Sequence, residues 1–232
     1  MKETFFSQYL KGFTNLLFPN LCIGCETQLI STEQCICLSC RYNLPFFKAQ
    51  ESLKELFGLH LSKINTMHAF LIFQKENLTQ KLLHAIKYQN RKDLGLYLGT
   101  MWGAQLLPLH QAQHFDAIIP IPLFKSKTQK RGYNQSDLLA KGISKITGVS
   151  CIQGLQRIIN NDSQTKKDNV ERILNVKDVF QVHPQLKQKS LNHILIIDDV
   201  ITTGATLVAA MHIIQEALPG CAISLGALAV AQ

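Results

Sequence analysis

The fold is decided by the stretch Ile194-Leu195-Ile196-Ile197-Asp198-Asp199-Val200-Ile201-Thr202-Thr203-Gly204-Ala205-Thr206. It begins with a short, β-branched apolar run, which favours a buried parallel strand. Two adjacent acids and a turn rich in threonine and glycine follow, and an apolar helical pattern starts at Leu207. We therefore expect a strand over 194–198, a polar turn, and a helix over 206–217.

The turn from Thr202 to Thr206 is a candidate phosphate site, because free backbone N–H groups and the helix dipole favour an anion at a helix N-terminus. Asp198 and Asp199 would lie at the carboxyl end of the strand, where open α/β sheets bind ligands. Because acids repel phosphate, they suit ribose hydroxyls, bound directly or through Mg²⁺. The alternative is an ordinary turn between a strand and a helix, with Asp199 as a cap, but the whole pattern is more specific than two adjacent acids.

The same string resembles the PRPP-binding motif of type I phosphoribosyltransferases. The resemblance implies that Asp198 and Asp199 meet the 2′- and 3′-hydroxyls of the ribose. It also implies that the 5′-phosphate is held by the turn residues Thr202, Thr203, Gly204, Ala205 and Thr206.

Five of the seven cysteines lie within residues 22–40. They include two C-x-x-C pairs, Cys22 with Cys25 and Cys37 with Cys40, separated by eleven residues. Two such pairs complete a tetrahedral, structural Zn²⁺ site. Cys35 is left without a metal in this assignment. The alternatives are disulfides, which a reducing compartment disfavours, and a redox motif, which would not need a second copy.

The length of 232 residues fits one α/β domain and a small module, which we place at residues 59–232 and 1–58. The small module has five Lys/Arg and five Asp/Glu, whereas the rest has nineteen and eleven and so carries the whole net charge of +8. A basic domain indicates an anionic partner, either a polyphosphate ligand or nucleic acid. No apolar run is long enough to cross a membrane and no signal peptide is evident, so we expect a cytoplasmic protein without a membrane partner.

Apolar periodicity predicts the other elements. We expect helices over 5–18, 78–90, 93–107 and 135–146, a helix within 41–60, and strands over 116–121 and 222–230. Alternating strands and helices favour a parallel sheet with helices on both faces.

Two further segments are polar. Residues 122–135 predict a loop between a strand and a helix, with cations at Lys125, Lys127, Lys130 and Arg131 that could neutralise a pyrophosphate group. A solvated charged loop is the alternative. The segment 156–176 predicts a mobile lid or, alternatively, a long exposed loop; its polar residues include Gln164, Lys166, Lys167 and Arg172.

Taken together, the chain resembles the ComF family of competence-associated, phosphoribosyltransferase-like proteins, which includes ComFC and GntX-type members. The matching motifs are the paired cysteines, Ile86-Lys87-Tyr88, Ile119-Pro120-Ile121-Pro122, Arg131-Gly132-Tyr133-Asn134-Gln135, Arg157, Gln164, Glu171-Arg172, Asn175, Phe180 and the stretch 196–206. The resemblance implies a type I phosphoribosyltransferase fold with an N-terminal zinc-finger module. It also implies a role in natural transformation, on incoming single-stranded DNA in the cytoplasm.

Two functions remain open at this point. The first is a phosphoribosyltransferase of unknown acceptor, in which Mg²⁺ accompanies PRPP, Asp198 and Asp199 hold the ribose, and Arg131 stabilises the departing pyrophosphate. Lys87, Asn134, Gln135, Gln164 and Arg172 would line the pyrophosphate and lid region. The second is a protein without catalytic activity that binds single-stranded DNA, or partners a DNA helicase, with PRPP as a regulatory ligand. Its candidate DNA-binding residues are Lys125, Lys127, Lys130, Arg131, Lys166 and Lys167.

Overall fold

A computed structural model describes residues 19–48, 53, 57, 62–158 and 179–232. The chain divides into two units between Leu44 and Pro45, whereas the sequence prediction set the division after residue 58. Phe47, Leu53 and Phe57 are buried in the main apolar cluster of the larger unit. The predicted helix over 5–18 lies outside the described residues, as do the lid residues Gln164, Lys166, Lys167 and Arg172.

The smaller unit is built around its cysteines. Its one described helix, α2 (Leu38–Tyr42), is capped by Cys37, and an isolated antiparallel bridge joins Leu21 to Gln28. Helix α2 is a single turn of five residues, so this unit has little regular structure of its own.

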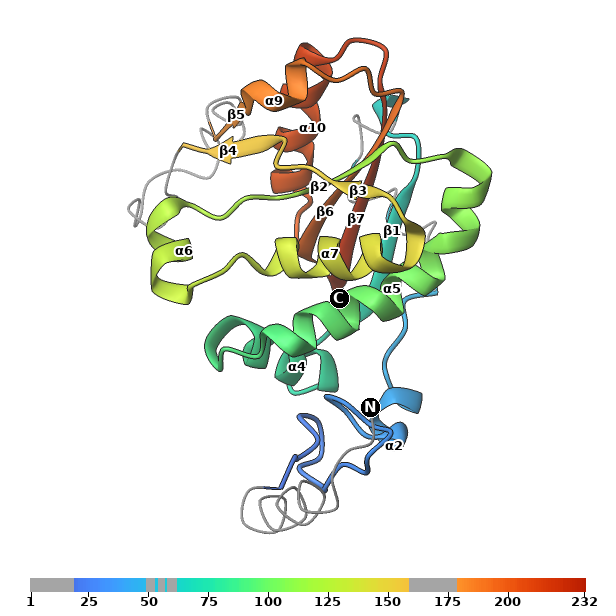
Figure 1. Ribbon diagram of the computed structural model, residues 1–232, viewed down its shortest axis with the longest axis vertical. Coiled ribbons are helices and arrows are strands. Elements are labelled where there is room, and N and C mark those ends of the chain that lie inside the picture. Colours follow the sequence, from blue (N-terminus) through green and yellow to red (C-terminus); the bar gives the residue numbers. More distant parts are fainter. Residues whose placement is uncertain (1–18, 49–52, 54–56, 58–61, 159–178) are drawn as a thin grey trace, which may run out of the picture. The chain divides into compact units, whose positions relative to one another are not determined.

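The larger unit contains a five-stranded sheet in the order β1-β7-β6-β2-β3 (Figure 1). All of its pairings are parallel. The strands are β1 (Met67–Phe73), β2 (Ala117–Pro120), β3 (Ser150–Cys151), β6 (His193–Ile201) and β7 (Ala222–Ala231). A separate antiparallel pair is formed by β4 (Leu155–Arg157) and β5 (Phe180–Val182), and α9 (Pro184–Lys187) follows it.

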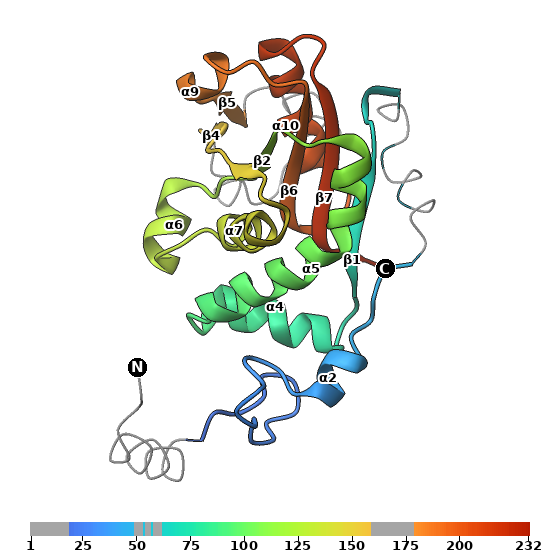
Figure 2. The same cartoon turned by 45° about the vertical axis from the view of Figure 1, so that its right-hand side comes forward.

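Helices cover both faces of the sheet, as predicted (Figures 1 and 2). Ile194 and Ile196 of β6 belong to the same apolar cluster as α10 (Ala205–Ala217). The alternate residue Ile197 lies against the position of Gly226, where Trp102 of α5 also packs. The opposite face therefore carries α5 (Lys92–Gln113), together with α4 (Leu78–Tyr88) and α7 (Gln135–Thr147).

Helices α5 and α7 approach each other at glycines. A Cβ atom at Gly142 would lie 2.4 Å from the carbonyl oxygen of Leu96 and 2.6 Å from Cα of Gly99. Only glycine permits this backbone contact, which fixes α7 against the sheet and thereby sets the position of the N-terminus of α7.

The predicted helices and strands of the larger unit are confirmed, with shifted ends. Helix α5 runs six residues beyond the expected end at 107 and contains Pro108. Strand β1 was not predicted, and β6 continues to Ile201 rather than ending at Asp198. The basic segment that was expected to be a loop forms a helix, α6 (Lys125–Arg131), which begins after Phe124 and ends at Gly132 in the left-handed conformation. Lysine, glutamine and arginine are good helix formers, and this explains the difference.

Candidate functional site

Asp198 and Asp199 lie where the sheet around β6 narrows. Strand β2 ends at Pro120, which pairs with Ile197, so from Asp198 onward β6 is paired with β7 alone. The edge left by β2 is occupied by the N-terminus of α7. The two acids are therefore in the last part of the strand rather than after it, and they are partly buried.

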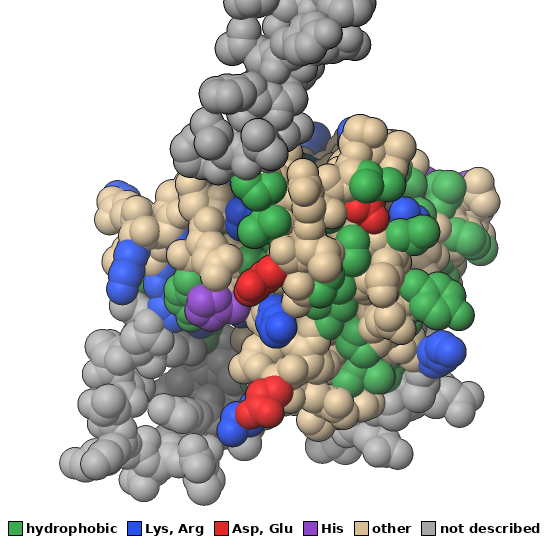
Figure 3. Space-filling model, turned by 90° about the horizontal axis from the view of Figure 1, so that it is seen from below, with side chains coloured by type: hydrophobic (Ala, Val, Ile, Leu, Met, Phe, Trp, Pro, Cys, Tyr) green, Lys and Arg blue, Asp and Glu red, His purple; other side chains and the backbone are tan. Residues whose placement is uncertain are grey.

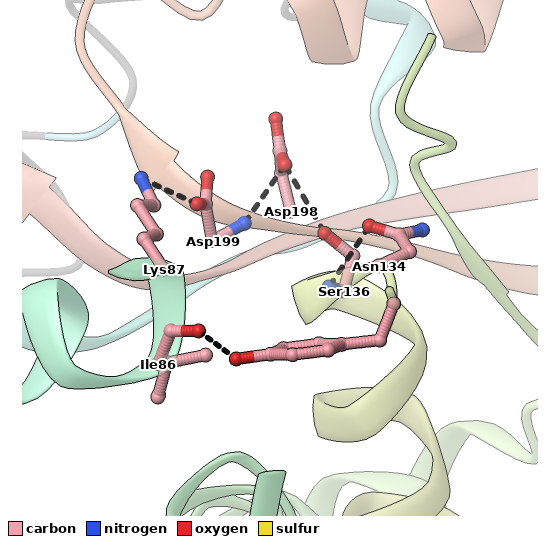
Figure 4. Close-up of polar contacts among 7 residues, drawn as sticks. Ile86, Lys87, Asn134, Ser136, Asp198 and Asp199 are labelled. Atoms are coloured by element: carbon pink, nitrogen blue, oxygen red, sulfur yellow. Dashed lines mark hydrogen bonds and ion pairs between the residues drawn. The ribbon is translucent and has the colours of Figure 1, made fainter. Parts of the chain in front are cut away.

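Asp198 accepts two hydrogen bonds through Oδ1. Ser136 donates from its hydroxyl at 3.3 Å, and the backbone N–H of Asp199 donates at 2.8 Å (Figure 4). Burial of the carboxyl, and then the charge of Asp199, raise the pKa of Asp198 to about 7, although the hydrogen bonds and Lys87 act in the opposite direction. The carboxyl can thus change its charge near neutral pH.

Asp199 has a cationic partner from another element. The Nζ atom of Lys87, near the end of α4, lies 2.5 Å from its Oδ2, and both side chains are mostly buried (Figure 4). The two neighbouring acids therefore differ in environment, because one is held by neutral donors and the other by a cation. Lys87 was predicted to lie in the pyrophosphate region, and the structure brings it to the acids.

The Arg131–Gln135 motif fixes the entry to α7. Tyr133 is buried and its hydroxyl donates to the backbone carbonyl of Ile86, which joins α7 to α4. Asn134 caps α7 by accepting from the N–H of Ser136, and its amide donates to the carbonyl of Ile121 at 2.9 Å. These contacts hold Ser136 beside Asp198 and Lys87 beside Asp199.

Two other residues of this motif have different surroundings. Gln135 is buried, and its Nε2 has no hydrogen-bond partner within the described part of the chain. The guanidinium of Arg131 lies over the ring of Tyr88, 5.5 Å from its centroid. The structure therefore gives Arg131 an aromatic partner in addition to its predicted place near a pyrophosphate.

The turn after β6 leads directly into α10. Thr202 and Thr203 are exposed, and Gly204 caps α10 with a φ of 74°, a left-handed conformation that favours glycine. The N-cap residue Gly204 has no side chain, the N–H of Ala205 donates to the hydroxyl of Thr203 at 3.4 Å, and the first turn has no acid. An anion at this helix N-terminus would therefore meet backbone N–H groups and threonine hydroxyls without a competing carboxylate. A cavity of about 20 Å³ is lined by Asp198 and residues 200–207.

Phe57 supports this turn from behind. A Cβ atom at Gly204 would lie 2.9 Å from the ring of Phe57, which is itself buried in the main apolar cluster. The ring and the positive φ independently exclude a larger residue at position 204. The turn is thus packed against the core and open toward solvent at its two threonines.

The four predicted metal ligands come together in the smaller unit. The sulfur atoms of Cys22, Cys25, Cys37 and Cys40 all lie within 4.8 Å of one another. Those of Cys25 and Cys37 are 3.6 Å apart, which fits two ligands of a tetrahedral zinc ion with Zn–S bonds of about 2.3 Å. The cluster could hold a zinc ion; Cys35 is buried and is not one of the four.

Local hydrogen bonds suit thiolates in this cluster. The N–H groups of Gly24 and Cys37 donate to the sulfur of Cys22, and that of Cys40 donates to the sulfur of Cys37. The pKa of Cys25 is lowered to about 6 by hydrogen bonds with Thr27, whereas burial raises the pKa of Cys40. Four thiolates this close would repel one another, so a cation is needed for all four to ionise.

Sequence reasoning missed three residues of this region: Ser136, Phe57 and Tyr88. Ser136 follows the recognised motif directly, and its position at a predicted helix start was the available signal. Phe57 was assigned to the smaller unit, which hid its contact with the turn. Tyr88 was included in the Ile86-Lys87-Tyr88 motif, but nothing in the sequence indicated that its ring is exposed.

The fold and the site define a parallel α/β protein with paired acids and a threonine-glycine turn at one strand end, together with a four-cysteine unit. No family model matches the chain. Competence protein F of Haemophilus influenzae is 24% identical over 210 residues, which make up 86% of each chain. Competence protein ComFC of Bacillus subtilis is 27% identical over 145 residues, 62% of this chain and 57% of the relative.

DNA utilization protein YhgH of Salmonella typhimurium is 29% identical over 130 residues, 54% of this chain and 56% of the relative. These relatives confirm the resemblance to the ComF family that the motifs carry.

The chain is also similar to solved structures, at a lower sequence identity than to these relatives. The glutamine PRPP amidotransferase of B. subtilis has a TM-score of 0.41 at 15% identity, over 62% of this chain and 30% of the other. An adenine phosphoribosyltransferase has a TM-score of 0.39 at 14% identity, over 65% of this chain and 75% of the other.

No helix among the described residues is long and apolar enough to span a membrane.

Proposed function

We propose that this chain is a PRPP-binding, phosphoribosyltransferase-like protein that acts in natural transformation on incoming single-stranded DNA in the cytoplasm. One observation carries the proposal. Two acids from the end of β6 and the acid-free N-terminus of α10 flank the same short turn, so acceptors for hydroxyls and backbone N–H groups suited to a phosphate are only a few residues apart. A sugar that carries both hydroxyls and a phosphate, such as the ribose 5-phosphate part of PRPP, fits that combination.

The roles of the residues follow from their positions. Asp198 and Asp199 would accept the ribose hydroxyls, and the turn residues 202–206 would hold the 5′-phosphate through backbone N–H groups and threonine hydroxyls. Lys87 neutralises part of the negative charge that Asp199 brings to the site. Ser136 donates to Asp198 from the other side, and Asn134 holds Ser136 by capping α7.

Mg²⁺ fits the donor set, since it prefers carboxylate oxygens and substrate phosphates. When bound with PRPP, the ion would neutralise charge between the ribose hydroxyls and the pyrophosphate. Departing pyrophosphate would also be neutralised by Arg131, Lys87 and the predicted lid residue Arg172, and the amide of the predicted lid residue Gln164 would donate a hydrogen bond to it. Zinc would have a structural role in the smaller unit, because its four cysteines leave no open ligand position.

A second candidate function is a DNA-handling protein in which PRPP is a regulatory ligand. The observation in its favour is α6, an acid-free helix whose four cations Lys125, Lys127, Lys130 and Arg131 could follow a phosphate backbone. The names of the relatives refer to competence and DNA utilization, and none refers to a transferase. A helicase partner would suit this second function.

The deciding experiment is titration of the protein with PRPP and Mg²⁺, with pyrophosphate release followed with and without single-stranded DNA. Binding with DNA-dependent release supports a transferase, and binding without release supports the second candidate. The double variant Asp198→Asn, Asp199→Asn should lose PRPP binding and keep DNA binding. Asp93→Asn, an exposed acid on α5, is the matched control and should bind PRPP normally. Wild-type protein that binds no PRPP contradicts the proposal.

A further inference from the structure

Tyr88, the last residue of α4, presents an aromatic ring to solvent. Its exposed fraction is 68%, and within the described part of the larger unit no other Phe, Tyr or Trp is classed as exposed. The sequence indicated Phe124 and Tyr133 as the aromatic candidates for base stacking, but Tyr133 is buried and bonded to α4, and Phe124 is half-buried. Single exposed apolar residues are common on folded domains, so the argument for a binding surface depends on the groups around this ring.

The ring is flanked by groups that bind nucleic acids. The guanidinium of Arg131 lies 5.5 Å from its centroid, and the ring of His84, one turn earlier on α4, lies 4.9 Å away at 45°. His84 is exposed and Arg131 is half-buried. Aromatic rings and guanidinium planes both stack on unpaired bases, with little dependence on sequence.

Further cations lie on the helices that contribute to this aromatic group or follow it in the chain. Helix α6, which ends at Arg131, contributes Lys125, Lys127 and Lys130 and no acid. Lys92, at the start of α5, is exposed and lies over the ring of Tyr133. The face seen from below carries Lys and Arg side chains together with acids and hydrophobic side chains (Figure 3). The arrangement around Tyr88 therefore combines an exposed ring with phosphate-binding cations, as single-strand binding surfaces do.

The surface also adjoins the acid pair. Lys87 contacts Asp199, and the next residue in the helix is Tyr88. A strand whose base stacks on Tyr88 would therefore lie at the same end of α4 as the lysine that contacts Asp199. A duplex could not use the ring in this way, because the faces of its bases are covered by stacking within the helix.

We propose that Tyr88, with Arg131 and His84, is the base-stacking platform of this protein for single-stranded nucleic acid, and that the cations of α6 bind the phosphates beside it. The proposal deepens the proposed function, because it locates the DNA contact and places it next to the acid pair. If the proposal is correct, the affinity for single-stranded nucleic acid depends on the ring of Tyr88, and the salt dependence of that affinity depends on the cations of α6.

Fluorescence anisotropy of a labelled oligothymidylate, with the full chain at several salt concentrations, tests this assignment. Tyr88→Ala should weaken binding about 5- to 150-fold and leave the salt slope unchanged, since stacking involves no counterion release. Tyr88→Phe keeps the ring and should bind within about twofold of wild type. The triple variant Lys125→Ala, Lys127→Ala, Lys130→Ala should flatten the salt slope. Tyr42→Ala, which removes an 85% exposed ring from the smaller unit, is the matched control and should bind normally.

Two results would overturn the platform: normal binding by Tyr88→Ala, whatever Tyr42→Ala does, or wild-type protein that prefers duplex or binds no oligonucleotide. PRPP titration of the same variants separates this proposal from the function proposed above. PRPP binding without Tyr88-dependent DNA binding removes the platform alone. Tyr88-dependent DNA binding without PRPP binding removes the PRPP site alone.

Discussion

The two units of this protein use different means to hold a fold. Of the five buried apolar residues among 19–44, three are cysteines, and the others are Ile36 and Leu44. The larger unit has a cluster of more than twenty buried residues, mostly Ile, Leu, Ala and Phe, around a parallel sheet. A short segment with so small a core depends on cross-links or a metal, whereas a sheet buried on both faces does not.

The comparison shows why the candidate site lies where it does. The apolar strands of the larger unit pack against the helices and fix the end of β6, so polar groups at the edge of the sheet are not needed to build the core. In the smaller unit the buried core consists mostly of cysteines, two of which are also candidate metal ligands. The predictions below test this division, beginning with the largest expected effect.

Cys22→Ser should abolish zinc binding and unfold the smaller unit, because a tetrahedral site loses a ligand. Structural zinc contributes on the order of 10 kcal/mol to the folding of small modules. Metal analysis should fall from one zinc per chain to none, and the amides of residues 19–44 should lose protection in hydrogen exchange. The larger unit should keep its unfolding free energy.

Cys151→Ser is the control for this change, since Cys151 lies in β3, outside the cluster. It should leave the zinc content at one per chain. Full zinc content in Cys22→Ser would remove that residue from the metal site, and simultaneous unfolding of the sheet would remove the independence of the two units.

Gly142→Ala should destabilise the larger unit and leave the zinc content unchanged. The added Cβ would lie 2.4 Å from a backbone carbonyl and 2.6 Å from another Cα, and neither can move without separating α5 from α7. We expect a loss of about 3 kcal/mol in unfolding free energy, measured by urea denaturation. Lys145→Ala, an exposed position on the same helix, is the control. An unchanged urea midpoint in Gly142→Ala would show that the helices separate at little cost.

Local patterns predicted much of this fold. Helices α4 and α7 and strand β7 follow from apolar spacing, and the turn after β6 follows from one motif. Strand β1, from Met67 to Phe73, was missed because a short apolar run can be a strand or a buried helix, and its pairing with β7 is decided some 150 residues later. The basic segment 125–131 was read as a loop because its charges concealed its helix propensity.

The site was predictable where one motif contains it and not where distant segments meet. Asp198, Asp199 and residues 202–206 are consecutive or nearly so. The contacts of Ser136 with Asp198 and of Lys87 with Asp199 join residues more than sixty positions apart, and only the packing of α4 and α7 brings them together. The exposure of Tyr88 depends on the same packing.

The smallest expected effect concerns Asp198. Ionisation of this buried carboxyl destabilises the larger unit at its candidate binding edge. Burial and the charge of Asp199 raise the pKa of Asp198 to about 7 from an ordinary value of 3.8. The folded chain therefore keeps this proton at pH values where the unfolded chain has released it. The contribution of Asp198 to the unfolding free energy is therefore fully present below about pH 4, and it is lost as the pH rises through 7.

Asp198→Asn, which stands in for the protonated acid, should remove this decline. One pKa unit corresponds to about 1.4 kcal/mol, and we expect the variant to exceed wild type by on the order of 1 kcal/mol at pH 8, because the carboxyl keeps some contact with solvent. Urea denaturation at pH 5 and pH 8 measures the difference, with Glu76→Gln, whose side chain is 84% exposed, as a control that should follow wild type at both pH values. If Asp198→Asn were less stable than wild type at pH 8, the ionised carboxyl would be stabilised in the free protein. The strand end would then resemble the smaller unit, in which charged groups and their partners hold the structure.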